Sequence, residues 1–266
     1  MVLKIPQPPS LKEFLEASNL EVAKEPPWVH SASAGRIWDF VNAGKIIAFP
    51  CNVFTGENLC YFFVGRPAYK RDDITNPGDW ELPMAFVMRF PKPPKIKRIF
   101  PFDSGAFANK RFPTYITMFK INRFDISGDQ RNIGRLISLV YRTPTQYFER
   151  RPSGHEEIKR EHDLLPRHQE ILAVSKLALE NASHQMDDRA AAIEVSVEED
   201  ITLLQEHLVG IVMPEEYERE KELWAHLKSL TPNLETYRIL PSSLHGYYAR
   251  VSDCVDRIYK KAGIQL

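Results

Sequence analysis

Polar side chains suited to chemistry stand at the ends of two expected strands within the stretch 28–69. One strand ends at His30, and an amphipathic helix then runs to Gly44, a residue type that often ends helices because it accepts a left-handed backbone. An aromatic strand follows at 60–64 and leads into Arg66. An imidazole and a guanidinium both offer hydrogen bonds to a ligand. These strand ends predict a site; the alternatives are a core histidine and an ordinary exposed arginine.

A third candidate is the carboxylate of Glu194, which lies inside the apolar run AAAIEVSV. Carboxylates are seldom placed among small and β-branched side chains unless they have a partner or a role. We therefore interpret Glu194 as functional. The alternative is a surface carboxylate on an edge strand.

The succession of these motifs resembles the NAD-consuming ADP-ribosyltransferases, most closely their DarT-type branch. The resemblance rests on His30 with the apolar helix after it, on the segment YFFVGRPAYKRD, and on the late strand that bears Glu194. It covers residues 28–72 and 187–214.

The resemblance implies an α+β fold: a strongly twisted two-sheet core of the ADP-ribosyltransferase type with surrounding helices. It also implies a single domain over residues 1–266. The charged region at 150–186, which Pro166 interrupts, is expected to be a helical insertion, and C-terminal helices are expected at about 215–262. Other expected helices cover 11–20, opened by a Ser10–Glu13 capping box, and 130–141. Expected strands cover 45–49, 84–90, 95–102, 112–124, 190–197 and 208–213.

Cleaving the nicotinamide bond of NAD develops positive charge on the ribose, so a carboxylate beside that sugar stabilises the transition state. The resemblance implies that Glu194 has this catalytic role and that Arg66 assists it by binding a phosphate or the acceptor. It implies NAD contacts from His30, Ser31, Ser33 and Tyr61. The two serines stand where the branch often has a threonine. Either Tyr61, a stacking ring in other branches, or Arg66 would complete the site; the alternative for Tyr61 is a core tyrosine.

The stretch 89–124 is rich in both basic and aromatic residues, with Asp103 as its one acid. Cations that follow a phosphate backbone and rings that stack on bases are what single-stranded nucleic acid binding requires. We therefore predict that the acceptor is bound by Arg89, Lys97, Arg98, Asp103, Lys110 and Arg111. The alternative is that the rings are core residues and the bases a solvated face.

Composition narrows the protein class. Hydrophobic residues make up 43% and charged residues 26%, with a formal net charge of zero, as is ordinary for a globular protein. No run approaches the ~20 apolar residues of a membrane span, and the first residues lack a signal-peptide core. The three cysteines are not spaced as a metal knuckle. We expect a cytoplasmic protein with no membrane segment and no metal.

These observations predict an NAD-dependent mono-ADP-ribosyltransferase that modifies single-stranded DNA or RNA and releases nicotinamide. The resemblance further implies a toxin or anti-phage effector with a neutralising antitoxin protein as its partner. Two other classes remain open at this point: an ADP-ribosyltransferase that modifies a protein, and a non-catalytic nucleic-acid-binding protein.

Overall fold

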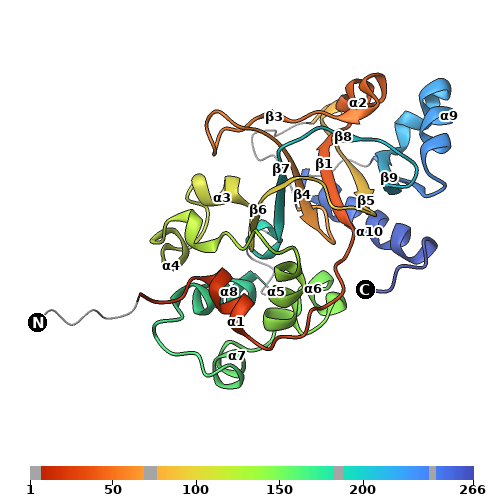
Figure 1. Ribbon diagram of the computed structural model, residues 1–266. Helices are drawn as coiled ribbons and strands as arrows, with labels where there is room; N and C mark the ends of the chain where they lie inside the picture. Colours follow the sequence, from red (N-terminus) through yellow and green to blue (C-terminus); the bar gives the residue numbers. More distant parts are fainter. Residues whose placement is uncertain (1–6, 69–76, 182–187, 240–243) are drawn as a thin grey trace, which may run out of the picture. The chain divides into compact units, whose positions relative to one another are not determined.

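The computed structural model describes residues 7–68, 77–181, 188–239 and 244–266 and shows a chain of mixed helices and strands (Figure 1). Its main sheet contains both parallel and antiparallel pairs. The predicted α+β fold class is confirmed at this level.

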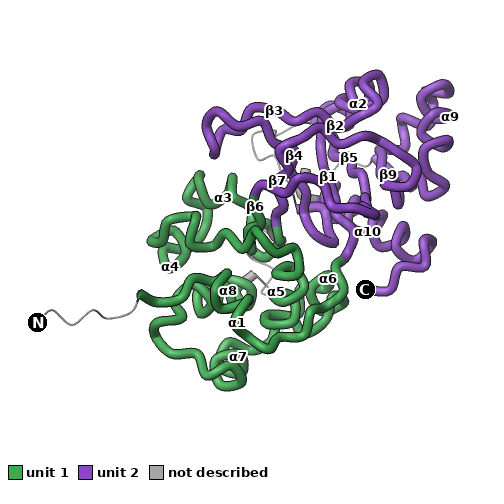
Figure 2. Tube along the Cα trace, viewed as in Figure 1, with its two compact units in different colours: residues 1–25, 98–193 green, residues 26–97, 194–266 purple. Residues whose placement is uncertain are grey.

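The chain divides into two compact units (Figure 2). Unit 1 comprises residues 1–25 and 98–193, and unit 2 comprises residues 26–97 and 194–266. Unit 1 is mostly helical, whereas unit 2 holds the sheet. The single domain over residues 1–266 stays a prediction.

Within unit 2, the sheet has the strand order β10-β9-β5-β1-β4-β7, and β3 pairs with β4 beside this path. β10 runs parallel to β9, whereas the pairs β1–β4, β1–β5, β4–β7 and β5–β9 are antiparallel. A separate two-stranded sheet joins β2 to β8. The strands are β1 (Trp28–Ser33), β2 (Lys45–Ile46), β3 (Phe49–Pro50), β4 (Asn58–Val64), β5 (Pro83–Met88), β6 (Ile96–Phe100), β7 (Glu194–Val197), β8 (Ile201–Thr202), β9 (Leu208–Pro214) and β10 (Leu234–Tyr237).

Strand register divides the side chains between two faces of this sheet. Val29 pairs with Phe63, and Phe63 pairs with Glu194, so these three side chains share one face, the Glu194 face. Because side chains alternate along a strand, this face carries Val29, Ser31, Tyr61, Phe63, Glu194 and Ser196. The opposite His30 face carries Trp28, His30, Phe62 and Phe86.

Each face is packed against a helix of unit 2. Helix α2 (Ile37–Ala43) covers the His30 face, where the Phe40 ring lies 5.8 Å from that of His30. It ends at Gly44, whose φ of 63° confirms the predicted left-handed helix end. Helix α10 (Leu244–Lys261) covers the Glu194 face at the β9–β10 end, and its Tyr259 hydroxyl donates to Gly65 O at 2.7 Å.

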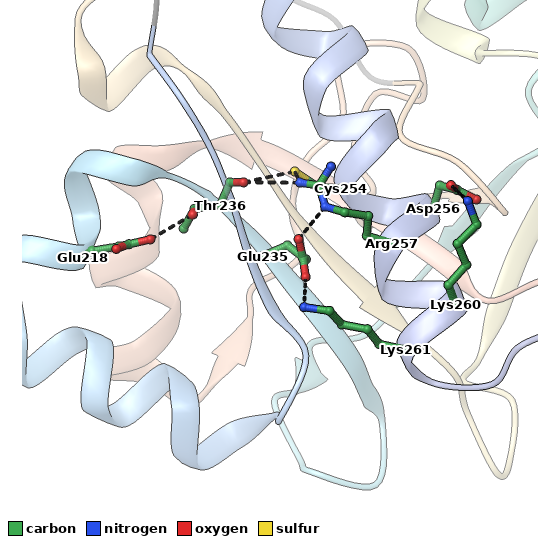
Figure 3. Close-up of polar contacts among 8 residues, drawn as sticks. All are labelled: Glu218, Glu235, Thr236, Cys254, Asp256, Arg257, Lys260 and Lys261. Atoms are coloured by element: carbon green, nitrogen blue, oxygen red, sulfur yellow. Dashed lines mark hydrogen bonds and ion pairs between the residues drawn. The ribbon is translucent and has the colours of Figure 1, made fainter.

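A polar network fixes α10 to the edge strand β10 (Figure 3). The carboxylate of Glu235 is 7% exposed and accepts a hydrogen bond from Arg257 Nε at 2.7 Å and another from Lys261 Nζ. Arg257 Nη2 also donates to Cys254 Sγ at 3.0 Å. Burial opposes ionisation of Glu235, but the bonds from its two cations outweigh burial and lower its pKa.

Unit 2 is completed by α9 (Lys221–Leu230) and by the 3-10 turns η1 (Ala34–Arg36), η2 (Asp79–Glu81) and η5 (Glu215–Arg219). The helices of unit 1 are α1 (Leu11–Ala17), α3 (Ser104–Ala108), α4 (Thr114–Thr117), α5 (Arg131–Tyr141), α6 (Pro144–Phe148), α7 (His155–Glu161) and α8 (Gln169–Asn181), with the 3-10 turns η3 (Ile121–Phe124) and η4 (Asp188–Ala191). The Ser10–Glu13 capping box is present at α1, as predicted. Helices α7 and α8, with Pro166 between them, occupy much of the described part of the region 150–186, and its being an insertion stays a prediction.

Three expected elements differ in the structure. The stretch 112–124 is not a β element: it forms α4 and η3, because Pro113 favours a helix start and the rings at its irregular spacing pack on one another. The strand expected at 190–197 begins only at Glu194, since η4 occupies the residues before it. The C-terminal stretch expected to be helical at about 215–262 is divided: η5 and α9 meet at Glu220, and the strand β10 follows before α10. The serines expected to cap α10, at 242 and 243, lie outside the described residues.

Candidate functional site

Three neighbouring strands bring the predicted site residues of unit 2 together. Strand β4 lies between β1 and β7, so the segments that hold His30, Tyr61 and Glu194 are adjacent in the sheet although far apart in the sequence. Tyr61 pairs directly with Ser196, and Phe63 pairs directly with Glu194. The sheet therefore places Tyr61 two residue pairs along from the carboxylate, on the same face.

The hydroxyls on the Glu194 face form a row across these strands. Tyr61 pairs with Ser196, and Ser31 lies on the same face of β1, two residues beyond the last β1–β4 pair, Val29 with Phe63. The Ser31 and Ser196 hydroxyl oxygens are buried and have no hydrogen-bond partner among the described residues. Ser33 follows on the same face as the last residue of β1, immediately before η1. Hydroxyls in such a row are suited to the polar edge of a sugar.

The phenol of Tyr61 is held by a cysteine that sequence reasoning missed. Its hydroxyl lies 2.7 Å from Cys51 Sγ, in the loop between β3 and β4. That sulfur also accepts the amides of Val53 and Phe54, at 3.2 and 3.1 Å. Ten residues and a turn separate Cys51 from Tyr61, so no short spacing signals the contact. Ser196 could have been predicted from the sequence. It stands two residues after Glu194, and side chains two residues apart on a strand lie on the same face.

His30 lies on the other face of the sheet. Its ring contacts Phe40, Phe62 and Phe86, with ring centroids 5.6 to 6.4 Å away. Burial lowers the pKa of His30 to about 4, against the opposing effect of its bond to Tyr61 O at 2.9 Å. Because a carbonyl only accepts, His30 Nδ1 carries the proton and donates it, which fixes the neutral tautomer. His30 thus supports the main chain of Tyr61 from the face opposite Glu194.

Glu194 and Arg66 are both almost wholly buried, with exposures of 2% and 3%. Arg66 lies two residues after Val64, the last residue of β4, and its amide donates to Val64 O at 2.9 Å. Gly65 between them has φ of 74°, a left-handed backbone that turns the chain away from the strand. A ligand phosphate would therefore reach the Arg66 guanidinium only after a local rearrangement.

The predicted acceptor-binding residues are divided between the units. Unit 2 holds Arg89, which is exposed, and Lys97, whose Nζ pairs with Glu198 at 3.0 Å. Unit 1 holds the others: Arg98, Asp103, Lys110 and Arg111. Lys110 and Arg111 are exposed. The side chain of Asp103 caps α3 by accepting the Ala106 amide at 2.7 Å.

Half of the eight aromatic residues of the stretch 89–124 are buried in the core. Phe100, Phe102, Phe112 and Phe124 are buried, and the Phe102 ring contacts those of Phe107, Phe112 and Phe124 at centroid distances of 5.0 to 5.6 Å. These buried rings are not placed to stack on bases. The exposed cations of the stretch retain the charge that a nucleic acid backbone requires.

A cavity of about 430 Å³ opens elsewhere in unit 2. Its lining includes four carboxylates and none of the predicted site residues: Ala48, Gly56, Glu57, Asn58, Glu198, Glu199 and Asp200. Lysines already pair with two of these carboxylates, since Lys45 Nζ lies 2.7 Å from Asp200 and Lys97 binds Glu198. Across the described ranges, no group of three or more His, Cys, Asp or Glu side chains is arranged to hold a metal ion.

Comparison of the chain with protein-family models, with curated proteins and with solved structures found no match to any of them. Within the part of the chain that the structure describes, no helix is both long enough and apolar enough to cross a bilayer.

Proposed function

We propose that this protein is an NAD-dependent ADP-ribosyltransferase that transfers ADP-ribose to single-stranded nucleic acid and releases nicotinamide. The observation that carries the proposal is the adjacency of β1, β4 and β7, which gathers Ser31, Tyr61 and Glu194 on one face. The sheet would then correspond to the twisted core of such transferases. An effector toxin with an antitoxin protein partner is the biological setting that follows from the same proposal.

In this reaction, the bond between the ribose C1′ and nicotinamide breaks, and nicotinamide leaves with the bonding electrons. The Glu194 carboxylate stabilises the cationic ribose and accepts the proton that the acceptor loses as its new bond to C1′ forms. The Tyr61 ring offers a flat surface to the ligand, and the Ser31 hydroxyl offers hydrogen bonds to its polar groups. His30 is assigned a supporting role because it bonds the Tyr61 main chain from the other face.

Nucleic acid is the acceptor class favoured by the exposed cations Lys110 and Arg111, which belong to a stretch with one acid. One observation favours a second candidate, a non-catalytic nucleic-acid-binding protein. The burial of Glu194 and Arg66 leaves neither side chain open to solvent. A modified protein as acceptor is tested in the same experiment.

The test measures nicotinamide release from NAD by the purified protein, alone and with single-stranded DNA, single-stranded RNA or cell protein. The variants are Glu194→Gln and, as a matched control, Glu198→Gln, whose carboxylate lies just beyond the same strand and pairs with lysines. Release that requires nucleic acid, falls at least about 100-fold in Glu194→Gln and persists in Glu198→Gln supports the proposal. Folded protein that releases no nicotinamide under any condition refutes it and favours the binding protein.

A further inference from the structure

The loop between β3 and β4 holds the sulfur of Cys51 in place through hydrogen bonds. The amide of Cys51 donates to Glu57 O at 2.8 Å, and Glu57 N donates to Phe54 O at 3.2 Å, so the loop closes on itself. Inside it, Cys51 Sγ accepts the amides of Val53 and Phe54. Two donors from the main chain restrict the sulfur to one position, because the loop backbone must move if the sulfur does.

The third contact of this sulfur is the Tyr61 hydroxyl, at 2.7 Å. A tyrosine ring on a strand has two side-chain torsions, and a bond at the far end of the ring restricts both. The main chain of Tyr61 is held independently, by pairing with Ser196 and by the bond from His30 Nδ1. Both ends of this residue are therefore fixed, and Cys51 fixes the end that carries the ring.

We infer that Cys51 is a positioning residue that orients the Tyr61 ring for ligand binding on the Glu194 face. This inference rests on the proposed function, in which NAD is the ligand that meets the ring. A ring held in its bound orientation binds a flat ligand group more tightly than a ring that must be ordered on binding. The contact therefore acts on NAD affinity and leaves the chemical step at Glu194 unchanged.

The experiment compares KM for NAD and kcat among Cys51→Ala, Cys51→Ser, Tyr61→Phe and the Cys51→Ala/Tyr61→Phe double variant. Loss of one neutral hydrogen bond predicts a KM increase of about fivefold in Cys51→Ala, with kcat within about twofold of the wild type. Cys51→Ser, which keeps a donor and acceptor, restores most of the affinity. The double variant resembles either single variant, since both remove the same contact. Two results would overturn the inference. One is a KM increase in the double variant equal to the product of the increases in the two single variants, and the other is a KM for NAD in Cys51→Ser as high as in Cys51→Ala.

Cys60→Ala is the matched control, because Cys60 is a buried cysteine of β4 on the opposite face, bonded to Ile46 O. The Cys60→Ala variant should be less stable than the wild type but have the same KM for NAD. A KM increase as large as that of Cys51→Ala would show that the Cys51 effect follows from lost stability in general, and would overturn the inference. A wild-type protein that neither releases nicotinamide nor binds NAD refutes the proposed function, and the inference with it. An active wild-type protein whose KM ignores Cys51 refutes the inference alone.

Discussion

His30 donates a hydrogen bond to the main chain of Tyr61, yet the two side chains lie on opposite faces of the same sheet. The Tyr61 ring shares the Glu194 face, while the imidazole lies among Phe40, Phe62 and Phe86. A single ligand on the Glu194 face meets Tyr61 and not His30. Any effect of His30 on that ligand acts through the backbone of β4.

The first prediction concerns the stability that the protein loses in acid because His30 is buried in its neutral form. Burial lowers its pKa to about 4 in the folded protein, against about 6.5 in an unfolded chain. The unfolded state therefore binds the proton more readily, so this contribution is full above pH 6.5 and is lost as the pH falls towards 4. The loss amounts to about 3 kcal/mol at most, at about 1.4 kcal/mol for each pKa unit. The free energy of unfolding, measured by denaturant at several pH values from 7.5 to 4, tests this loss of stability.

The His30→Gln variant keeps a donor for Tyr61 O but does not titrate, so its stability falls less steeply between pH 6.5 and 4 than that of the wild type. His226→Gln, at an exposed histidine of α9, serves as the control and keeps the wild-type slope. Equal slopes for all three proteins would show that His30 is not desolvated in solution.

The second prediction concerns the three free thiols. Burial raises the pKa of Cys60 to about 12 and that of Cys254 to about 11, so neither forms a reactive thiolate near pH 8. Cys51 is half-exposed. Iodoacetamide should therefore modify Cys51 in the native protein and all three residues in denaturant, as read by peptide mass spectrometry. Rapid native labelling of Cys60 or Cys254 would contradict the packing described for β4 or α10.

Local sequence signals predicted several elements of both units. The capping box at Ser10, the helix end at Gly44 and the strands β4, β5 and β9 each follow from a few neighbouring residues. The sequence did not determine which side chains of β1 lie on the Glu194 face. A shift of one residue in strand register moves every side chain to the opposite face, so it would place His30 instead of Ser31 on that face with no change in composition.

The remaining differences come from long-range packing. The alternating character of 112–124 suggested a β element, but Phe112, which precedes α4, and Phe124, which lies in η3, both pack on Phe102. The Cys51–Tyr61 contact depends on how the loop after β3 folds, which no pairwise spacing encodes. Burial of Glu194 likewise depends on segments far from it in the chain.

The third prediction concerns the close approach of α10 to β9 at Gly210. A methyl group there would lie 2.6 Å from Ile258 Cγ2 and 2.8 Å from Asn233 O, and the backbone oxygen cannot move aside cheaply. Gly210→Ala should therefore lower the free energy of unfolding by about 1–3 kcal/mol, measured by urea denaturation. Gly154→Ala is the control, because its nearest neighbour is 3.7 Å away and its backbone is not left-handed. Equal stability of the two variants would contradict the packing of α10 on this face.

The last prediction concerns the Glu235 network of Figure 3. Arg257→Gln removes one of the two cations that bind this buried carboxylate, and we expect it to lower the free energy of unfolding by about 1–2 kcal/mol. This loss of stability is smaller than for a fully buried ion pair, because the side chains of Arg257 and Lys261 are about half exposed. Since the pKa of Glu235 is lowered, this contribution is present above the unfolded pKa of about 4.3 and is lost as the pH falls below it.

Lys260→Gln on the same helix provides the control, since Lys260 pairs with Asp256 at the surface rather than with a buried group. It should change stability by less than about 0.5 kcal/mol. In a double-mutant cycle, Glu235→Gln should remove most of the effect of Arg257→Gln, because the arginine then has no buried charge to bind. Additive losses would mean that Arg257 stabilises α10 through its bonds to Thr236 O and Cys254 Sγ instead, and that the carboxylate of Glu235 depends on Lys261 for its charge.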